Sequence, residues 1–566
     1  MKPYSRWIAL AAMFFTGFAR AETADLNAVH LIKQEAYFHS QVMDYIHLIA
    51  DEHGSRMAGS PSYRSAADKA VAAFKEAGIE QVEVEAWGKF GRGWDWSRVH
   101  VQMKTPQETT LSAYPADFAP GTDGPVSGEV VFAPLWDHPS MASVNDDIEK
   151  TAHQIERWKS KYRGQLEGKI VMLDHPHSFK IPAEPETYRL GEQEIASGVA
   201  NDYDMPLKPG RVPTLEWPML AYPIDKEESS QVWNVIPIEF ATDRWRLNAR
   251  IMSRMGEFLV EEGVGAALVS GGAGIAGVIM HSDYGSPYSG DSLPPPSVAL
   301  MPEHYNRIHR LLNRGVPVTV EVDVDAEIYE DVDGLNIIAE LPGTDRKNEV
   351  VMLGAHFDSW HGATGATDNA AGSAIVMEAM RILKKLKLPM KRNVRAALWG
   401  EEETCFCGSR GYVEDHFADP ITMKLKPEHD KLSVYFNLDG GGGKIRGIYL
   451  QQNDMARPVL EAWLAPFADQ EVDMFTITNT TGTDHLSFDA VGLPGFSFVQ
   501  DSLDYYVNTH HSNVDHADHL IPGDLMQAAA VMATAVYHAA NSDELMPRKT
   551  LPRSLPPKNK LPDILQ

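Results

Sequence analysis

Residues 350–358 read Val350-Val351-Met352-Leu353-Gly354-Ala355-His356-Phe357-Asp358. The apolar run Val350–Gly354 has the length and the β-branched content of a buried strand, and a histidine and an aspartate follow it. Further runs of this kind occur on both sides along the chain, at Asn336–Ala339, Val394–Trp399, Leu432–Leu438 and Gly495–Val499. The second half of the chain therefore predicts a set of buried strands.

Helical patterns alternate with these runs. Asn369 to Leu386 carries apolar residues at helical spacing, and Leu525 to Ala540 is a second helical run. Strands that alternate with helices are typical of a largely parallel sheet covered by helices. We therefore predict an α/β fold, a three-layer sandwich around a mostly parallel sheet.

Chemically active side chains follow four of the predicted strands. They are His356, Asp358 and Asp368; Glu401, Glu402 and Glu403; Asp439; and His510 and His511. In open α/β sheets, ligands bind beyond the carboxyl ends of the strands, so we expect these groups to converge. Imidazoles and carboxylates without thiolates suit a pair of catalytic metal ions better than a structural cysteine site. The pattern predicts two Zn²⁺ ions about 3.5–4 Å apart with a bridging carboxylate.

The order of these motifs resembles the co-catalytic di-zinc exopeptidases, the family of secreted bacterial aminopeptidases and plasma glutamate carboxypeptidase. The motifs that carry the resemblance are Ala355–Ser359, Ala366–Gly372, Trp399–Glu403, Asn437–Asp439 and His511–Asp515, with Arg56–Pro61 and Gly482–Phe488 in support. The resemblance covers roughly residues 50–110 and 330–540. It implies the zinc exopeptidase fold.

The resemblance also implies a role for each site residue. His356 and Asp439 would hold one zinc ion, Glu403 and His511 would hold the other, Asp368 would bridge, and Glu402 would be the general base. Chemistry alone leaves the register of the three glutamates and of the two histidines open. The family's spacing to Gly408-Ser409 selects Glu402 as base, and its spacing to Asp515 selects His511 as ligand.

Several neighbouring residues have two interpretations. Asp358 either holds the second nitrogen of His356 or caps a helix or loop. His510 stands where many relatives have a tyrosine that stabilises the oxyanion, and whether it takes that role stays open. Cys405 and Cys407 either form a disulfide or remain buried thiols. We expect Asp484 and Asp515 to be structural.

Composition restricts the partners. The chain has 566 residues, with 51 Lys and Arg against 78 Asp and Glu, and a formal net charge of −27. This charge disfavours nucleic acid and anionic membrane surfaces as partners. Two cysteines exclude a disulfide scaffold. The expected partners are peptide substrates; the oligomeric state stays open, with a homodimer as one candidate.

The first 21 residues have the pattern of a secretory signal peptide. Lys2 and Arg6 precede an apolar run from Trp7 to Phe18, and Ala19-Arg20-Ala21 follows. The apolar run is shorter than the about 20 residues that a membrane span needs. We expect cleavage after Ala21, export to the periplasm or the medium, and no membrane attachment afterwards.

The predicted domains follow from these patterns. Residues 22–115 and 326–545 would form the catalytic domain, with the metal site in the second part, and residues 546–566 a loose Pro-rich tail. Residues 116–325 contain β-like runs at Gly128–Ala133, Lys169–Leu173, Ala266–Ser270 and Gly277–Met280 among Pro- and Gly-rich stretches. Leu166–Val171 and Gly265–Val269 resemble a protease-associated domain, which implies a β-rich insert.

The predicted function is a secreted zinc-dependent exopeptidase that hydrolyses the N-terminal peptide bond of peptides or dipeptides. Carboxypeptidase-type hydrolysis, or amide hydrolysis or cyclisation of a non-peptide substrate, is the alternative on the same scaffold. A receptor-like homologue without catalysis is a third hypothesis, although such a protein would be expected to lose a ligand or the base.

Overall fold

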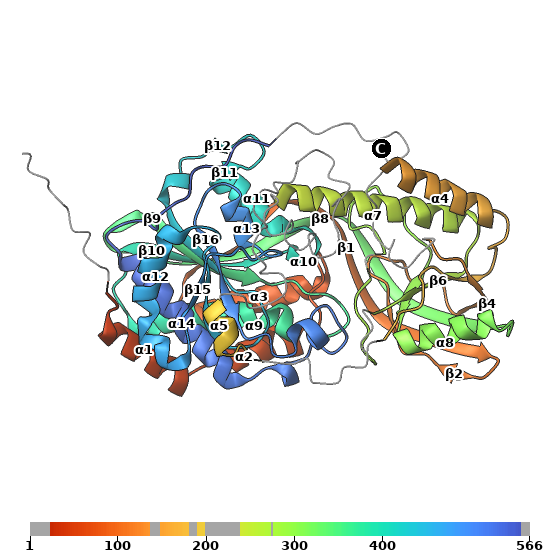
Figure 1. Ribbon diagram of the computed structural model, residues 1–566, viewed down its shortest axis with the longest axis horizontal. Coiled ribbons are helices and arrows are strands. Elements are labelled where there is room, and N and C mark those ends of the chain that lie inside the picture. Colours follow the sequence, from red (N-terminus) through yellow and green to blue (C-terminus); the bar gives the residue numbers. More distant parts are fainter. Residues whose placement is uncertain are drawn as a thin grey trace, which may run out of the picture.

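The protein is described by a computed structural model that covers residues 23–135, 148–179, 189–197, 238–272, 276–282 and 284–555. These residues form two lobes that lie side by side (Figure 1). The signal peptide predicted for residues 1–21 and the end of the Pro-rich tail, 556–566, lie outside the described residues.

The larger lobe is built on a mixed, mostly parallel sheet. From its edge inward the strands are β15 (Met474–Thr476), β14 (Ile445–Tyr449), β16 (Gly495–Gln500), β13 (Leu432–Asn437), β9 (Arg346–His356), β10 (Arg392–Trp399) and β8 (Thr319–Leu341). The four central strands, β16, β13, β9 and β10, run parallel. Strand β8 pairs antiparallel with β10, and β14 pairs antiparallel with β16 and parallel with β15. The predicted α/β fold and each of its five strands are confirmed.

Helices cover both faces of this sheet. Along β9, Val351 and Leu353 point to one hydrophobic cluster, and Val350 and Met352 point to another. Alternation with a period of two residues, with apolar side chains on both faces, is expected for a strand that is buried on both faces. The first cluster includes α1 (Leu26–Phe38), α2 (Val42–Ile46), α3 (Pro61–Glu76), α9 (Ala371–Leu386) and α14 (Pro522–Asn541), and the second includes α11 (Cys407–His416) and α13 (His485–Asp489). The result is the predicted three-layer sandwich.

Helix α9 is the central support of the first face. Residues 371–383, all but its last three positions, are buried, because α14 and α1 pack over a helix that already lies on the sheet. Its buried charges are paired: Arg381 donates to Glu378 and to Glu35, both at 2.7 Å. Arg381 also donates to the His39 carbonyl, at the break between α1 and α2. Apolar residues recur at helical spacing from Leu31 to Asp51, which favours one continuous helix, but the helix is interrupted where these polar contacts form.

The smaller lobe continues the sheet beyond β8. Its strands are β4 (Val126–Phe132), β5 (Ile170–Met172), β6 (Ala266–Ser270), β7 (Ser297–Leu300) and β3 (Ala113–Pro115), and its long helices are α4 (Ile148–Tyr162), α7 (Ile238–Glu261) and α8 (Pro302–Asn313). The expected run Gly277–Met280 forms no strand, because both sides of β6 are occupied by β5 and β7. Met280 instead makes a single bridge to Ser512. The protease-associated likeness and the boundaries at 115 and 325 stay predictions.

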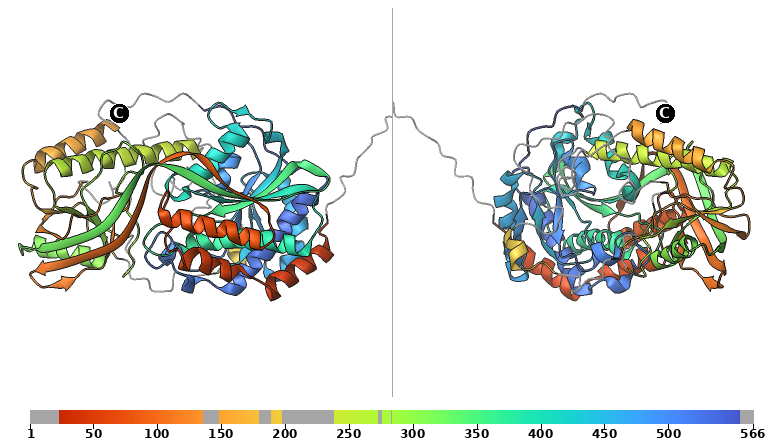
Figure 2. Two further views of the ribbon diagram at one scale, coloured as in Figure 1. Left: turned by 180° about the vertical axis from the view of Figure 1, so that it is seen from behind. Right: turned by 45° about the vertical axis from the view of Figure 1, so that its right-hand side comes forward.

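A long two-stranded ribbon joins the lobes. Strand β1 (Gln81–Thr105) pairs antiparallel with β8 from Gln81↔Glu340 to Thr105↔Thr319, and the ribbon runs from one lobe into the other (Figure 2). The alternation of side chains in the sequence indicates a strand only over Gln81 to Trp87. The strand continues because register shifts around Gly88, Gly91 and Gly93 absorb the irregular pattern there.

The described part of the Pro-rich tail lies against the larger lobe. Arg548 donates to the Leu432 carbonyl at 2.7 Å and to the His429 carbonyl at 3.0 Å. The Leu555 amide donates to the Ile421 carbonyl at 2.9 Å. Residues 546–555 are therefore held by specific contacts, in contrast to the loose tail that the composition predicted. Within the described residues, no helix has the length and apolar content needed to cross a membrane.

Replacement of Ile375 by alanine tests the role of α9. The side chain is fully buried in the first cluster, so Ile375→Ala should lower the free energy of unfolding by about 2–5 kcal/mol. Urea denaturation followed by circular dichroism measures the change. Lys385→Ala, at an exposed position of the same helix, should change it by less than about 0.5 kcal/mol. Equal effects of the two substitutions would contradict the assignment.

Candidate metal centre

The carboxyl ends of the four central strands meet at one edge of the larger lobe. His356 ends β9, Glu402 and Glu403 begin α10 (Glu402–Cys405) after β10, Asp439 follows β13, and His511 follows β16. Asp368 lies in the turn Ala366–Ala370 that leads into α9. Because these strands are parallel neighbours, residues far apart in the sequence arrive at the same place.

The predicted ligands form two groups that share Asp368. In the first group, His356 Nε2 lies 3.2 Å from Asp368 Oδ1 and 3.4 Å from Asp439 Oδ1. In the second group, His511 Nε2 lies 2.9 Å from Glu403 Oε2 and 3.4 Å from Asp368 Oδ2. Each oxygen of Asp368 therefore faces a different imidazole, which is the arrangement that a bridging carboxylate requires.

The donor set fits a pair of cations. Asp368 Oδ2, Glu402 Oε1 and Glu403 Oε1 are buried and have no hydrogen-bond partner. Burial, followed by the repulsion of Asp368, raises the pKa of Glu403 well above its usual value. Buried carboxylates that repel one another are costly unless a cation compensates them. Imidazole nitrogen and carboxylate oxygen are ligands that zinc accepts, so the residues present suit the predicted metal.

Asp358 supports the site in both of the ways considered from the sequence. Its carboxylate accepts from the amides of Glu402 at 3.1 Å and Glu403 at 3.2 Å, at the start of α10. His356 Nδ1 lies 3.0 Å from the Asp358 carbonyl oxygen and 3.5 Å from its Oδ1. One residue thus fixes the imidazole of His356 and the backbone that carries both glutamates.

Asp515 holds the backbone of the bridging position. It accepts from the Thr367 amide at 2.6 Å and from the Asp368 amide at 3.0 Å. Burial, and then the charge of Asp368, raises the pKa of Asp515 to about 7. The sequence indicated a structural role for this residue, and these contacts describe what that role is.

Arg56 is a support that the sequence did not identify individually. Its buried guanidinium donates to the carbonyls of Phe357 at 2.7 Å, Thr364 at 2.7 Å and Gly365 at 2.9 Å. These carbonyls flank the loop between His356 and Asp368. The only signal in the sequence was its place in the Arg56–Pro61 motif.

His510 lies beside the second group. Its ring stacks on that of His511 with centroids 3.7 Å apart, and its Nε2 is 4.0 Å from Asp368 Oδ2. Burial, and then the neighbouring His511, lowers the pKa of His510 to about 4. The imidazole is therefore neutral at neutral pH.

Cys405 and Cys407 form a disulfide. Of the two interpretations of this pair, a disulfide or two buried thiols, the structure has the disulfide.

The smaller lobe also reaches the site. The His281 amide donates to the His511 carbonyl at 2.9 Å, and the Asn513 amide donates to the Ile279 carbonyl at 2.9 Å. The His281 ring stacks on Trp360 with centroids 3.9 Å apart. No local pattern marked residues 279–281 as part of the site, because their partners lie about 230 positions further along the chain.

Residues 336–536 match the family model described as Peptidase family M28. These matched residues are called the M28 domain below. This domain includes all five predicted metal ligands and Glu402. The predicted resemblance to the co-catalytic zinc exopeptidases is thereby confirmed.

Relatives of the M28 domain include both carboxypeptidases and aminopeptidases by name. Carboxypeptidase Q of Mus musculus is 30% identical over 298 residues, which are 52% of this chain and 61% of the relative. Aminopeptidase YwaD of Bacillus subtilis (strain 168) is 27% identical over 238 residues, 41% of this chain and 49% of the relative. The chain thus spans less than two thirds of the length of the curated relatives that it matches.

Solved structures share the fold. A peptidase M28 precursor from Shewanella amazonensis SB2B has a TM-score of 0.63 at 22% identity, over 93% of this chain and 99% of that one. The zinc aminopeptidase BSAP from Bacillus subtilis has a TM-score of 0.50 at 17% identity, over 92% of this chain and 95% of that one. The similarity to the Shewanella protein extends beyond the M28 domain to both lobes.

Asp515→Asn should weaken metal binding. Each carboxylate oxygen of Asp515 accepts from a different amide, and asparagine replaces one of these oxygens by an NH2 group that would face the Thr367 or the Asp368 amide donor to donor. We expect zinc affinity to fall by about 10–100-fold, as for other groups that orient a ligand. Competition with a chromogenic chelator measures the affinity. Asp518→Asn, at an exposed position three residues later, is the matched control, and equal affinity of both variants would contradict the assigned role.

Proposed function

We propose that the protein is an exported zinc-dependent exopeptidase that hydrolyses the N-terminal peptide bond of peptides or dipeptides. The observation that carries the proposal is Asp368, whose two oxygens face His356 and His511 in two separate ligand groups. The M28 domain and the relatives named aminopeptidase support the reaction class. The signal-peptide pattern of residues 1–21 supports export.

Glu402 is the proposed general base. Its Oε2 lies 4.0 Å from His356 Nε2, and its Oε1 is buried without a hydrogen-bond partner. Burial raises the pKa of Glu402 well above its usual value, which suits a carboxylate that must accept and return a proton near neutral pH. Chemistry alone left three adjacent glutamates as candidates and the family's spacing selected Glu402, a choice that this position supports.

The side chains divide the work of hydrolysis. When bound, two zinc ions would lower the pKa of a water toward about 7 and polarise the scissile carbonyl. Glu402 then accepts the proton of the attacking water and delivers it to the leaving amine. We assign to the neutral imidazole of His510 the donation of a hydrogen bond to the developing oxyanion. Asp358, Asp515 and Arg56 keep these groups in place through the backbone.

A carboxypeptidase-type activity is the second candidate. The relatives named Carboxypeptidase Q reach 30% identity with this chain, above the 27% of Aminopeptidase YwaD. The two candidates share the metal ligands and the base, and they differ in which terminus of the substrate is held. Substrates with blocked and free termini therefore distinguish them.

Glu402→Gln should remove turnover and leave metal binding intact. The amide cannot accept the proton of the water, so kcat should fall by about 10²–10⁴-fold or more, while zinc analysis should still give two equivalents per chain. Glu401→Gln is the matched control. Trp87 donates to Glu401 at 2.8 Å. Burial raises the pKa of Glu401 well above its usual value, which favours its neutral, protonated form. Glutamine resembles this form, so the substitution should be mild. Unchanged turnover in Glu402→Gln would remove this residue from the mechanism.

The zinc-loaded enzyme should hydrolyse aminoacyl-p-nitroanilides and dipeptides with a free N-terminus. Chelation should abolish the activity and zinc should restore it, because ligand groups without metal lack the Lewis acid. The measurement is the rate for paired free and N-acetylated substrates. Hydrolysis of N-blocked substrates alone would reject the aminopeptidase proposal in favour of the second candidate. The absence of two equivalents of zinc together with no hydrolysis would favour a non-catalytic binding protein.

A further inference from the structure

One short segment of the smaller lobe, Ile279–His281, lies against the loop that carries the proposed ligand His511. We call this segment the clamp. Met280 forms an isolated β-bridge with Ser512, and the amide of His281 donates to the His511 carbonyl at 2.9 Å. The clamp therefore holds the backbone of a metal ligand directly.

Asn513 holds the clamp from the side of the larger lobe. Its amide donates to the Ile279 carbonyl at 2.9 Å, and its Oδ1 accepts from the Ile279 amide at 2.6 Å. One residue, two positions after His511, thus satisfies both polar groups of the Ile279 backbone. Loss of the Asn513 side chain would remove the acceptor of the Ile279 amide, which costs free energy at a buried residue.

His511 needs this support because of its backbone conformation. Its φ is +57°, in the left-handed region, where a residue with a Cβ is less stable than in the right-handed region. In this conformation its Nε2 lies 2.9 Å from Glu403 Oε2 and 3.4 Å from Asp368 Oδ2. The contacts with the clamp therefore stabilise the conformation in which His511 reaches the other ligands of the second group.

The first ligand group is supported from within the larger lobe. His356 ends β9, and its Nδ1 lies 3.0 Å from the Asp358 carbonyl oxygen. The Ser373 hydroxyl, on α9, donates to the His356 carbonyl at 2.7 Å. The two proposed metal positions thus differ in the lobe that supports their histidine.

The clamp is fixed to the core of the smaller lobe. The Met280 amide donates at 2.8 Å to the carbonyl of Gly271, which directly follows β6. Ile279 is buried in the hydrophobic cluster of that lobe. A Cβ at Gly271 would lie 2.5 Å from Ile279 Cγ2, so these two residues are in close contact. A shift of the smaller lobe would therefore move the clamp with it.

The clamp also contacts the loop that follows β9. The His281 ring stacks on the Trp360 indole with centroids 3.9 Å apart, and its centroid lies 4.8 Å from that of the His511 ring. One residue of the smaller lobe thus touches two of the loops that surround the metal centre.

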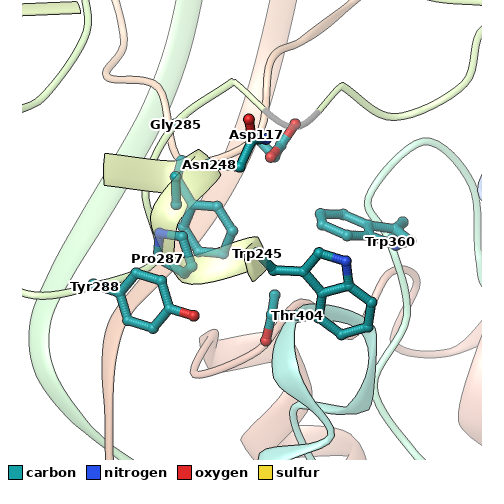
Figure 3. A pocket seen from close by; sticks show the side chains of 10 residues that line it. Asp117, Trp245, Asn248, Gly285, Pro287, Tyr288, Trp360 and Thr404 are labelled. Atoms are coloured by element: carbon teal, nitrogen blue, oxygen red, sulfur yellow. The ribbon is translucent and has the colours of Figure 1, made fainter. Parts of the chain in front are cut away.

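Beyond Trp360 the two lobes leave a space. Trp360 and Thr404 of the M28 domain, with Trp245 and Tyr288 from outside it, line a cavity of about 60 Å³. Figure 3 shows the indoles of Trp245 and Trp360 on one side of this cavity and the ring of Tyr288 on the other. Because packing is incomplete here, the hydrogen bonds at the clamp carry part of the docking of the lobes.

We propose that the clamp sets the zinc affinity of the second metal position, and that zinc at Glu403 and His511 and docking of the smaller lobe stabilise each other. Asn513 is the positioning residue that links the two. The identity of the metal rests on the proposed function. Partial separation of the lobes would release zinc from one position and leave the other filled. Since such coupling is reciprocal, each event should favour the other by the same factor.

Asn513→Ala tests the effect of the clamp on the metal. Zinc affinity is measured by competition with a chromogenic chelator in two backgrounds: Asp439→Ala, in which the second position reports, and Glu403→Ala, in which the first reports. We expect a fall of about 10–100-fold in the first background and no change in the second. Asn508→Ala is the matched control, because its side chain donates to Asp504 at 3.4 Å within the same loop.

Gly271→Ala reaches the metal centre through the clamp, without any change in the larger lobe. The added Cβ displaces Ile279, so zinc affinity in the Asp439→Ala background should fall. The further substitution Ile279→Ala removes the clashing atom and should restore the affinity, and Ile279→Ala alone is its control. Asn513→Asp, which keeps an acceptor oxygen, should not lower the affinity.

Hydrogen exchange tests the effect of the metal on the clamp. Exchange is followed at single residues by mass spectrometry on Glu402→Gln, with zinc and with chelator. The amides of Ile279 and His281, which donate to the larger lobe, should exchange about 10–100-fold more slowly with zinc. The Met280 amide donates within the smaller lobe and should not respond. Asn513→Ala should remove the zinc effect.

Three results would overturn the proposal. The first is an equal loss of affinity at both metal positions in Asn513→Ala, which would make this residue a general support of the larger lobe. The second is unchanged affinity in both Asn513→Ala and Gly271→Ala. The third is exchange at Ile279 and His281 that ignores zinc.

These measurements do not require turnover, so they separate the clamp from the proposed function. Two zinc ions that couple to the clamp as expected, without hydrolysis of any peptide, would support the clamp and reject the proposed function alone. Hydrolysis of peptides by a protein whose second metal position ignores Asn513 and Gly271 would reject the clamp alone.

Discussion

The rest of the structure must accommodate one constraint, the crowding of carboxylates at one buried edge of the sheet. Asp368, Glu402, Glu403 and Asp439 converge on His356 and His511, and such a cluster repels itself unless cations compensate it. A cluster of this kind cannot position itself, because every charge would favour separation. Four parallel strands bring the residues together, and Arg56, Asp358 and Asp515 hold the connecting backbone by neutral amide and carbonyl groups. The scaffold thus opposes the repulsion until metal is bound.

The sequence predicted the parts of this arrangement that have local signals. Buried strands are short apolar runs, and the residue that follows each of them lies at the functional edge of a parallel sheet. The positions of His356 and Asp439 could therefore be predicted before the fold was known, whereas the choice of His511 over His510 needed the family's spacing to Asp515. The register within Glu401–Glu403 needed the family's spacing, since three adjacent carboxylates are chemically alike. In the structure they differ by environment: Glu401 pairs with Trp87, whereas Glu402 and Glu403 face the histidines.

The parts that the sequence did not predict are contacts between distant segments. Nothing near Gly277–Met280 indicates that its partner is the loop after β16, so the run was interpreted as an ordinary strand. The break between α1 and α2 coincides with contacts to Glu378 and Arg381 of α9. Strand β1 looked short because Gly88, Gly91 and Gly93 interrupt its alternation, and only pairing with β8 shows that it continues. Each of these features depends on a residue hundreds of positions away.

The ribbon of β1 and β8 has a consequence for how the chain is made. Gln81 pairs with Glu340 and Thr105 with Thr319, so the N-terminal strand leaves the ribosome long before its partner exists. Until residue 319 is synthesised, a strand of mixed polar and apolar residues with unpaired amides and carbonyls stays open to other chains. Pairings this distant also close slowly, because a large loop must be ordered first. Assembly of both lobes therefore waits for one late strand, and heterologous production should benefit more from a holding chaperone than from a shortened chain that lacks the smaller lobe.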